Sequence, residues 1–326
     1  MYFIIKKNFK KIMELNTNSN LIKAINKDKL FSLYKEISDK INDDTYLKLI
    51  KDKGNNEIEK QNNENMVQII NQIKENINKY PLDISLYKDS GDNIELINKN
   101  YTLITPNDNF FTFKSYPSNN LLLLLINNIF LSFLNKCFCF KFFFMEAFNK
   151  SEVDSIAPLN EKIIKIINTQ NIDIHDYIIN EIFIDFTNRD LLTFLGIRRT
   201  KGSIDNYIPL DKEILIGKFK ELNNEKSKLT VGAKALCKHS HRSVTESFWP
   251  GQGGKEIEKN QNAEKMLNLF LEECVWINIH LLPHNLVIIE LRIDKGYGIR
   301  WQVNDGMFRG FLEPQMEDGH EKGWIH

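Results

Sequence analysis

Histidine and arginine side chains near the C-terminal end of the chain are the groups best able to do chemistry. Residues 275–282, 286–293 and 297–303 alternate in polarity, which predicts three strands joined by antiparallel hairpins. The predicted site on and beside their polar face consists of His239, His241, Arg242, Asn278, His280, Glu290, Arg292 and Arg300. Arginine offers a planar fork for carboxylate or phosphate, and His and Asn add directional hydrogen bonds. We therefore expect a soluble binding or scaffold protein that recognises an anionic group.

Two other interpretations of this face stay open. Antiparallel sheets often have one solvated face, on which Glu290 would form ordinary cross-strand ion pairs with Arg292 or Arg300. Alternatively, the chain is a hydrolase or transferase that uses His280 or His320 as acid and base. The sequence contains no GxSxG elbow, Walker A loop or dinucleotide fingerprint. Catalytic residues are therefore unassigned, and whether the chain is an enzyme is left open.

A metal site is the next alternative. Cys237, His239 and His241 alternate and would share one face of an extended strand, where they could ligate zinc or iron. Lys238 and Arg242 flank this set, and no clear carboxylate completes it. We therefore predict no metal ligand and no cofactor, with zinc or iron as the minority interpretation.

The charge balance bears on partners. The chain carries 43 basic and 43 acidic side chains, so it has no global positive field that would draw it to nucleic acid. We accordingly expect no nucleic-acid partner. Four cysteines without a CxxC pair favour a reducing compartment. The N-terminal apolar run precedes its lysines, the reverse of a secretory signal, so we expect a cytoplasmic protein.

The elements that must position the site indicate an α+β protein. Residues 1–115 are mainly helical in periodicity, and residues 146–326 are expected to form an α+β domain with a dense block of Trp, His and Gly at 229–326. In that block, apolar residues at helical spacing over 262–274 predict an amphipathic helix packed on one face of the antiparallel sheet. Further strands are expected at 94–104, 182–186 and 229–236.

Between these two parts lies an apolar insert, 116–145. Its core, 118–144, contains five consecutive leucines and a Phe-rich run, interrupted by Asn and Lys. A membrane span, a buried core hairpin or helix, and the translation of a retained intron all agree with this composition. A membrane partner is expected only if this segment spans a bilayer. An uninterrupted spliced message that encodes the run would exclude the intron.

Several strings in the last third resemble an uncharacterised eukaryotic protein family. They are Gly232-Ala-Lys-Ala-Leu, Trp276-Ile-Asn-Ile-His280, Glu290-Leu-Arg292 with Gly296-Tyr-Gly-Ile-Arg-Trp301, and Gly310-Phe-Leu-Glu-Pro314 with Gly319-His320 and Gly323-Trp324. The resemblance implies that this block is one unit. It implies no activity, cofactor or catalytic residue.

Overall fold

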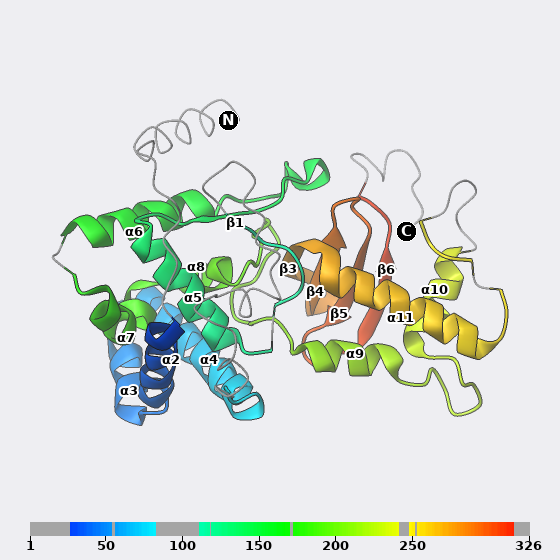
Figure 1. Ribbon diagram of the computed structural model, residues 1–326, viewed down its shortest axis with the longest axis horizontal. Coiled ribbons are helices and arrows are strands. Elements are labelled where there is room, and N and C mark those ends of the chain that lie inside the picture. The colour runs from blue at the N-terminus through cyan, green and yellow to red at the C-terminus, as the bar shows by residue number, and fades with distance from the viewer. Residues whose placement is uncertain are drawn as a thin grey trace.

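The computed structural model describes residues 27–53, 56–82, 111–117, 119–169, 172–240, 248–251 and 253–315. His241, Arg242 and His320, and the strands expected at 94–104, lie outside the described residues. The described chain forms a helical lobe and a lobe built on an antiparallel sheet (Figure 1). This arrangement confirms the predicted α+β class, with a mainly helical N-terminal region and helices against a C-terminal sheet.

The helical lobe is formed by seven of the described helices, several of which have side-chain caps. It contains α2 (Lys27–Ile41), α3 (Asp44–Asp52), α4 (Glu57–Lys79), α5 (Leu121–Leu134), α6 (Ile156–Thr169), α7 (Ile174–Asp185) and α8 (Asn188–Phe194). Asn56 caps α4 by accepting from the amide of Glu59, and Asp173 caps α7 in the same way. The strand expected at 182–186 is wrong, because these residues complete α7. A short apolar run has no period that separates a buried strand from a buried helix.

The apolar insert supplies α5, the central helix of this lobe. Every residue from Leu121 to Phe133 is buried, and the Asn120 side chain caps the helix. The two asparagines within it form a chain of hydrogen bonds: Asn127 donates to Asn128, which donates to the carbonyl of Phe194 at 2.7 Å. Across the described residues, no helix is long and apolar enough to cross a membrane. The retained intron and the domain limits at 115 and 145 stay predictions, which transcript sequencing and limited proteolysis would check.

Two very short strands and a 3₁₀ turn accompany this lobe. β1 (Phe111–Thr112) pairs in parallel with β2 (Phe140–Lys141). The turn η3 (Glu146–Phe148) follows, and its Phe148 ring stacks on Trp276 of the other lobe with centroids 4.5 Å apart.

The sheet has four antiparallel strands in the order β3-β4-β5-β6. They are β3 (Cys274–Leu282), β4 (Leu286–Ile293), β5 (Gly298–Gln302) and β6 (Phe308–Leu312). The first three confirm the predicted strands and both predicted hairpins, one of which turns through η4 (Pro283–Asn285). The fourth was not predicted, because a bulge between Arg300 and Trp301 of the β5–β6 pair breaks the alternation of period two.

Helices cover one face of this sheet. They are α9 (Lys212–Lys220), α10 (Val231–Ser240) and α11 (Glu256–Glu273), and α11 crosses the sheet in Figure 1. The predicted stripe of α11 is confirmed, since Ala263, Met266, Leu267, Phe270, Leu271 and Cys274 are all buried. The strand expected at 229–236 is wrong, because α10 occupies this segment and the hydroxyl of Thr230 accepts from the amide of Ala233 at its start.

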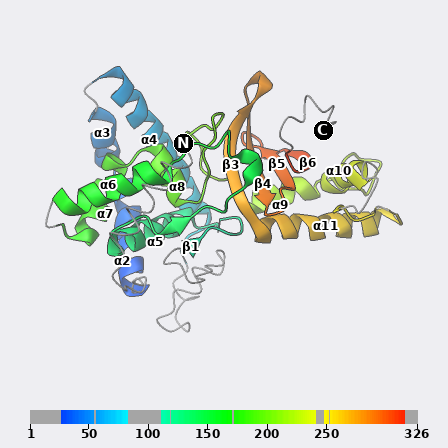
Figure 2. The same ribbon diagram turned by 90° about the horizontal axis from the view of Figure 1, so that it is seen from above.

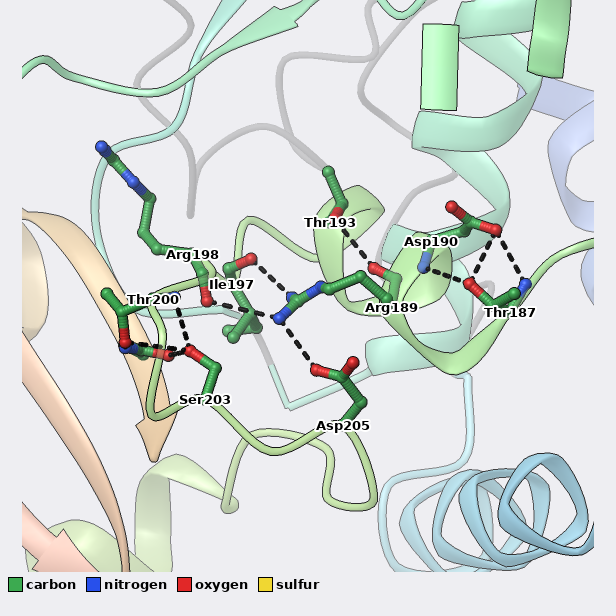
Figure 3. Close-up of polar contacts among 10 residues, drawn as sticks. Thr187, Arg189, Asp190, Thr193, Ile197, Arg198, Thr200, Ser203 and Asp205 are labelled. Carbon is green, nitrogen blue, oxygen red and sulfur yellow. Dashed lines mark hydrogen bonds and ion pairs between the residues drawn. The ribbon is translucent and has the colours of Figure 1, made fainter. Parts of the chain in front are cut away.

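The two lobes are joined along the outer edge of β3, the strand nearest the helical lobe (Figure 2). The amide of Arg198 donates to Ile277 at 2.7 Å, and that of Ile204 donates to Ile279 at 3.1 Å. Arg189 of α8 holds this segment from behind, donating to the carbonyl of Ile197 at 2.7 Å and pairing with Asp205 at 3.1 Å (Figure 3). Residues 198–204 therefore close the edge of the sheet with hydrogen bonds.

Candidate active site on the polar sheet face

The sheet face opposite the helices brings His280, Glu290 and Arg292 together. Register pairs Asn278 with Glu290 and Trp276 with Arg292, so alternate residues of β3 and β4 share this face. His280 Nε2 lies 3.3 Å from Glu290 Oε2, and Arg292 Nε donates to Glu290 Oε1 at 2.6 Å. One carboxylate thus joins an imidazole and a guanidinium.

Glu290 is held in its ionised form. Burial raises the pKa of its carboxyl, but the charge of Arg292 and the hydrogen bond and charge of His280 together outweigh burial. The net result is a pKa well below the usual range of a glutamate. An ionised carboxylate only accepts hydrogen bonds, so the proton in its contact with His280 resides on Nε2. In a neutral ring, His280 Nδ1 is then the proton acceptor.

Arg292 links β4 to the turn before β5 and to the segment after β6. Its Nη1 donates to the carbonyl of Gly296 at 2.6 Å and to that of Glu313 at 2.9 Å. Its guanidinium also lies over the Phe148 ring, 5.1 Å from the centroid. Arg292 Nε and Nη1 therefore already donate to oxygen atoms of the protein, and these contacts hold the side chain in place.

Arg300 differs from Arg292. It lies on β5 directly opposite Glu290, and no described residue accepts a hydrogen bond from its Nε. Burial lowers the pKa of Arg300; Glu290 opposes this shift, and the charges of Arg309 and Arg292 add to it. Two arginines, Arg292 and Arg300, therefore share this face of the three strands with one carboxylate, which is already bound to Arg292 and His280. The described part of the face carries excess positive charge.

Part of the face is covered by the rest of the chain. Asn278 is 1% exposed; its amide donates to Thr200 Oγ1 at 2.9 Å, and its carbonyl oxygen accepts from Ser203 Oγ at 2.7 Å (Figure 3). Trp276 is likewise buried against Phe148. Asn278 thus ties the lobes together, whereas His280 and Arg300 keep partial exposure. This face is therefore not the solvated sheet face that was one of the two open interpretations.

His239 lies apart from this group. Its Nδ1 is 3.2 Å from Glu313 Oε1, which also accepts from Trp249 Nε1 at 2.6 Å, and its ring contacts Phe311 on the helix-covered side. The structure therefore brings together Asn278, His280, Glu290, Arg292 and Arg300 but not His239. His241 and Arg242, the other two predicted residues, lie outside the described residues.

The geometric premise of the zinc or iron alternative is wrong. Cys237 and His239 belong to α10, and residues two apart on a helix point roughly 200° away from each other. Within the described ranges, no group of three or more His, Cys, Asp or Glu side chains is placed to hold a metal ion.

Sequence reasoning missed three contributors to this face. Arg309 lies in the unpredicted strand β6, and Phe148 and Ser203 come from segments that precede the four strands in sequence. An Arg-Gly pair between Phe308 and Phe311 was the available signal for a bulged strand. Nothing local marked Phe148 or Ser203, because their contacts are made across the two lobes.

Comparison with known proteins concerns the C-terminal third of the chain. Residues 220–313, which include α10, α11 and the four strands, match the model of a family described as the CdiA C-terminal tRNase toxin domain. No curated protein and no solved structure matches the chain.

This match corrects one expectation and refines another. The expectation of no nucleic-acid partner is wrong, because the matching family is described as tRNases, whose substrate is RNA. The resemblance noted in the sequence covers the same third of the chain, but the matching family carries a functional description where we expected none. The segment that bears the His280, Glu290 and Arg300 face is thus similar to the CdiA C-terminal tRNase toxin domain.

Proposed function

We propose that the chain is a ribonuclease acting on tRNA or a similar RNA, and that the polar sheet face is its active site. One observation carries the proposal: the segment that matches the tRNase toxin domain contains both the hydrogen-bonded His280–Glu290 pair and Arg300, whose Nε has no hydrogen-bond partner among the described residues. The excess positive charge of this face complements a phosphodiester.

His280 is the proposed base. Its Nδ1 takes the proton of a ribose 2′-hydroxyl, and the 2′ oxygen attacks the adjacent phosphorus. The bond from phosphorus to the 5′ oxygen breaks, and that oxygen takes a proton, from water in the simplest case. The products are one RNA end with a 2′,3′-cyclic phosphate and one with a 5′-hydroxyl. The hydroxide left from that water takes the proton back from His280 Nδ1, so the ring ends neutral and the protons balance.

Glu290 and Arg292 position this base. Glu290 fixes the His280 ring by accepting from Nε2 and stabilises the imidazolium that forms. Arg292 holds Glu290 and is itself held by Gly296 and Glu313. Arg300 binds the phosphate and stabilises the negative charge that grows on it during attack. The chemistry and the positioning are thus divided between different side chains.

His280→Ala tests the proposal. With purified full-length chain and a tRNA mixture, we expect the wild type to cut RNA and the variant to be slower by about 10² or more, the usual contribution of a general base. His175→Ala is the matched control, because His175 lies on α7 of the helical lobe and pairs with Glu36. Cleavage is measured on denaturing gels, and end-group analysis should show the cyclic phosphate.

Two outcomes would count against this function. Equal cleavage by the His280 and His175 variants would remove His280 from the chemistry. A wild-type chain that binds RNA with saturation but cuts none would leave anion recognition without a reaction, as expected of a binding protein.

A further inference from the structure

The bulge in β6 places a second arginine beside Arg300. Register pairs Arg300 with Gly310 and then Trp301 with Phe308, so Arg309 is the extra residue of β6. Phe308 and Phe311 on either side both pack on Phe219 of α9, on the helix-covered side. Arg309 is exposed at the rim of the polar face.

Among the described residues, the charges of Arg300 and Arg309 are balanced only in part, by Glu290 acting on Arg300. Arg309 is close enough for its charge to act on Arg300, yet no described carboxylate forms an ion pair with either. The contact recorded for the Arg309 guanidinium is a long one of 3.9 Å to the sulfur of Met307. Two adjacent guanidinium groups that repel each other favour a bound anion.

The strand beside Arg300 also leaves room for such an anion. Gly310 has a φ of +123°, and a Cβ built on it would meet no described atom within 4 Å. A side chain at this position would lie on the polar face, because Gly310 is paired with Arg300. Its absence lets a ligand approach the backbone of β6 closely.

We propose that Arg309, with the open surface at Gly310, binds the RNA phosphate next to the one that is cut. This subsite rests on the proposed ribonuclease function. Strands lie about 4.8 Å apart, so β6 is roughly 14 Å from β3 and His280, and roughly 5 Å from β5 and Arg300. Arg300 lies between the two and binds the reacting phosphate, and Arg309 lies one strand further from the base. The RNA backbone thus crosses the sheet from β3 towards β6.

Removing the Arg309 charge from the protein and the flanking phosphate charges from the substrate tests this subsite. The substrate is a DNA oligonucleotide with a single cleavable ribonucleotide, compared with the same oligonucleotide carrying neutral methylphosphonates at the two phosphates that flank the scissile one. We expect Arg309→Gln to lower kcat/KM about tenfold on the charged substrate, since one charged hydrogen bond is lost. The variant should show no further loss on the neutral substrate, because the partner is already absent. Lys265→Gln, on the exposed side of α11, is the matched control.

Binding gives a readout that does not need turnover. With an all-deoxy oligonucleotide, which cannot be cut through a 2′-hydroxyl, Arg309→Gln should weaken binding and reduce the slope of log affinity against log salt by about one. If no RNA is cut but this slope changes, the ribonuclease function fails and the phosphate subsite stands. If RNA is cut and Arg309→Gln behaves like Lys265→Gln with every oligonucleotide, the subsite is overturned and the ribonuclease stands.

Discussion

Arg292 and Arg300 share one sheet face but differ in what their guanidinium groups contact. Arg292 binds a buried carboxylate and two carbonyl groups, and Arg300 has a buried Nε with no partner in the described chain. Removing an arginine that the protein already satisfies leaves its buried partner unpaired, whereas a partly exposed arginine with an unsatisfied donor can still bind a ligand. The same residue type therefore has a structural role at position 292 and is proposed to bind a ligand at position 300.

Arg292→Ala should be strongly destabilising. It leaves the buried carboxylate of Glu290 without its main partner, a change that typically costs about 3 kcal/mol or more. Arg300→Ala, the matched control on the same face, should cost about 1 kcal/mol or less. Urea denaturation followed by circular dichroism measures both. Equal losses for the two variants would contradict the division of roles.

Much of this face is predictable from alternation alone. The period of two places Asn278, His280, Glu290, Arg292 and Arg300 on one side of three strands, as the structure does. Alternation does not show which of these side chains are occupied. The Arg292 contact with Glu313 and the Asn278 contacts with Thr200 and Ser203 join residues far apart in sequence, and no local pattern encodes them.

At the scale of elements, α10 shows why the pattern of polar and apolar residues predicts a strand where the structure has a helix. Its run of small and apolar residues predicts a strand, yet its glycine has a packing reason that fits a helix. A Cβ on Gly232 would overlap the ring of Phe219 in α9, so the two helices approach closely only because glycine is present. The periodicity of one segment does not indicate how closely it approaches another helix.

Gly232→Ala should therefore destabilise the protein although alanine favours helices. The gain of about 1 kcal/mol from helix propensity is smaller than the cost of overpacking, commonly 1–3 kcal/mol. Gly217→Ala is the matched control within α9, because its Cβ would meet no described atom within 4 Å. It should be neutral or stabilising. Thermal unfolding compares the two, and a rise in Tm for Gly232→Ala would disprove the close approach.

At the scale of the whole molecule, the lobes are joined by backbone hydrogen bonds as well as side-chain packing. Residues 198–204 pair with β3, and Arg189 ties that segment to α8. The α+β class and the helical start were predictable because long periodic segments are informative. The joining segment was not, because its strand-like pairing depends on a partner about 80 residues away.

Arg189→Ala should loosen this junction. Two carbonyl groups and Asp205 lose their donor, which should raise local opening and speed exchange of the Arg198, Ile204 and Leu281 amides by about tenfold or more. Amides in the middle of α11 serve as the internal reference and should be unchanged. Hydrogen exchange followed by mass spectrometry measures this. Uniform acceleration throughout the chain would instead indicate global destabilisation.

The position of Phe148 and Ser203 in the chain has a consequence for biosynthesis. Both residues contact the polar face, and both precede every strand of the sheet in sequence. A ribosome builds the chain from the N-terminus, and domains made first fold first. The helical lobe is therefore available to border β3 as soon as the sheet leaves the ribosome, so the polar face gains its contacts with Phe148 and Ser203 while the sheet is forming.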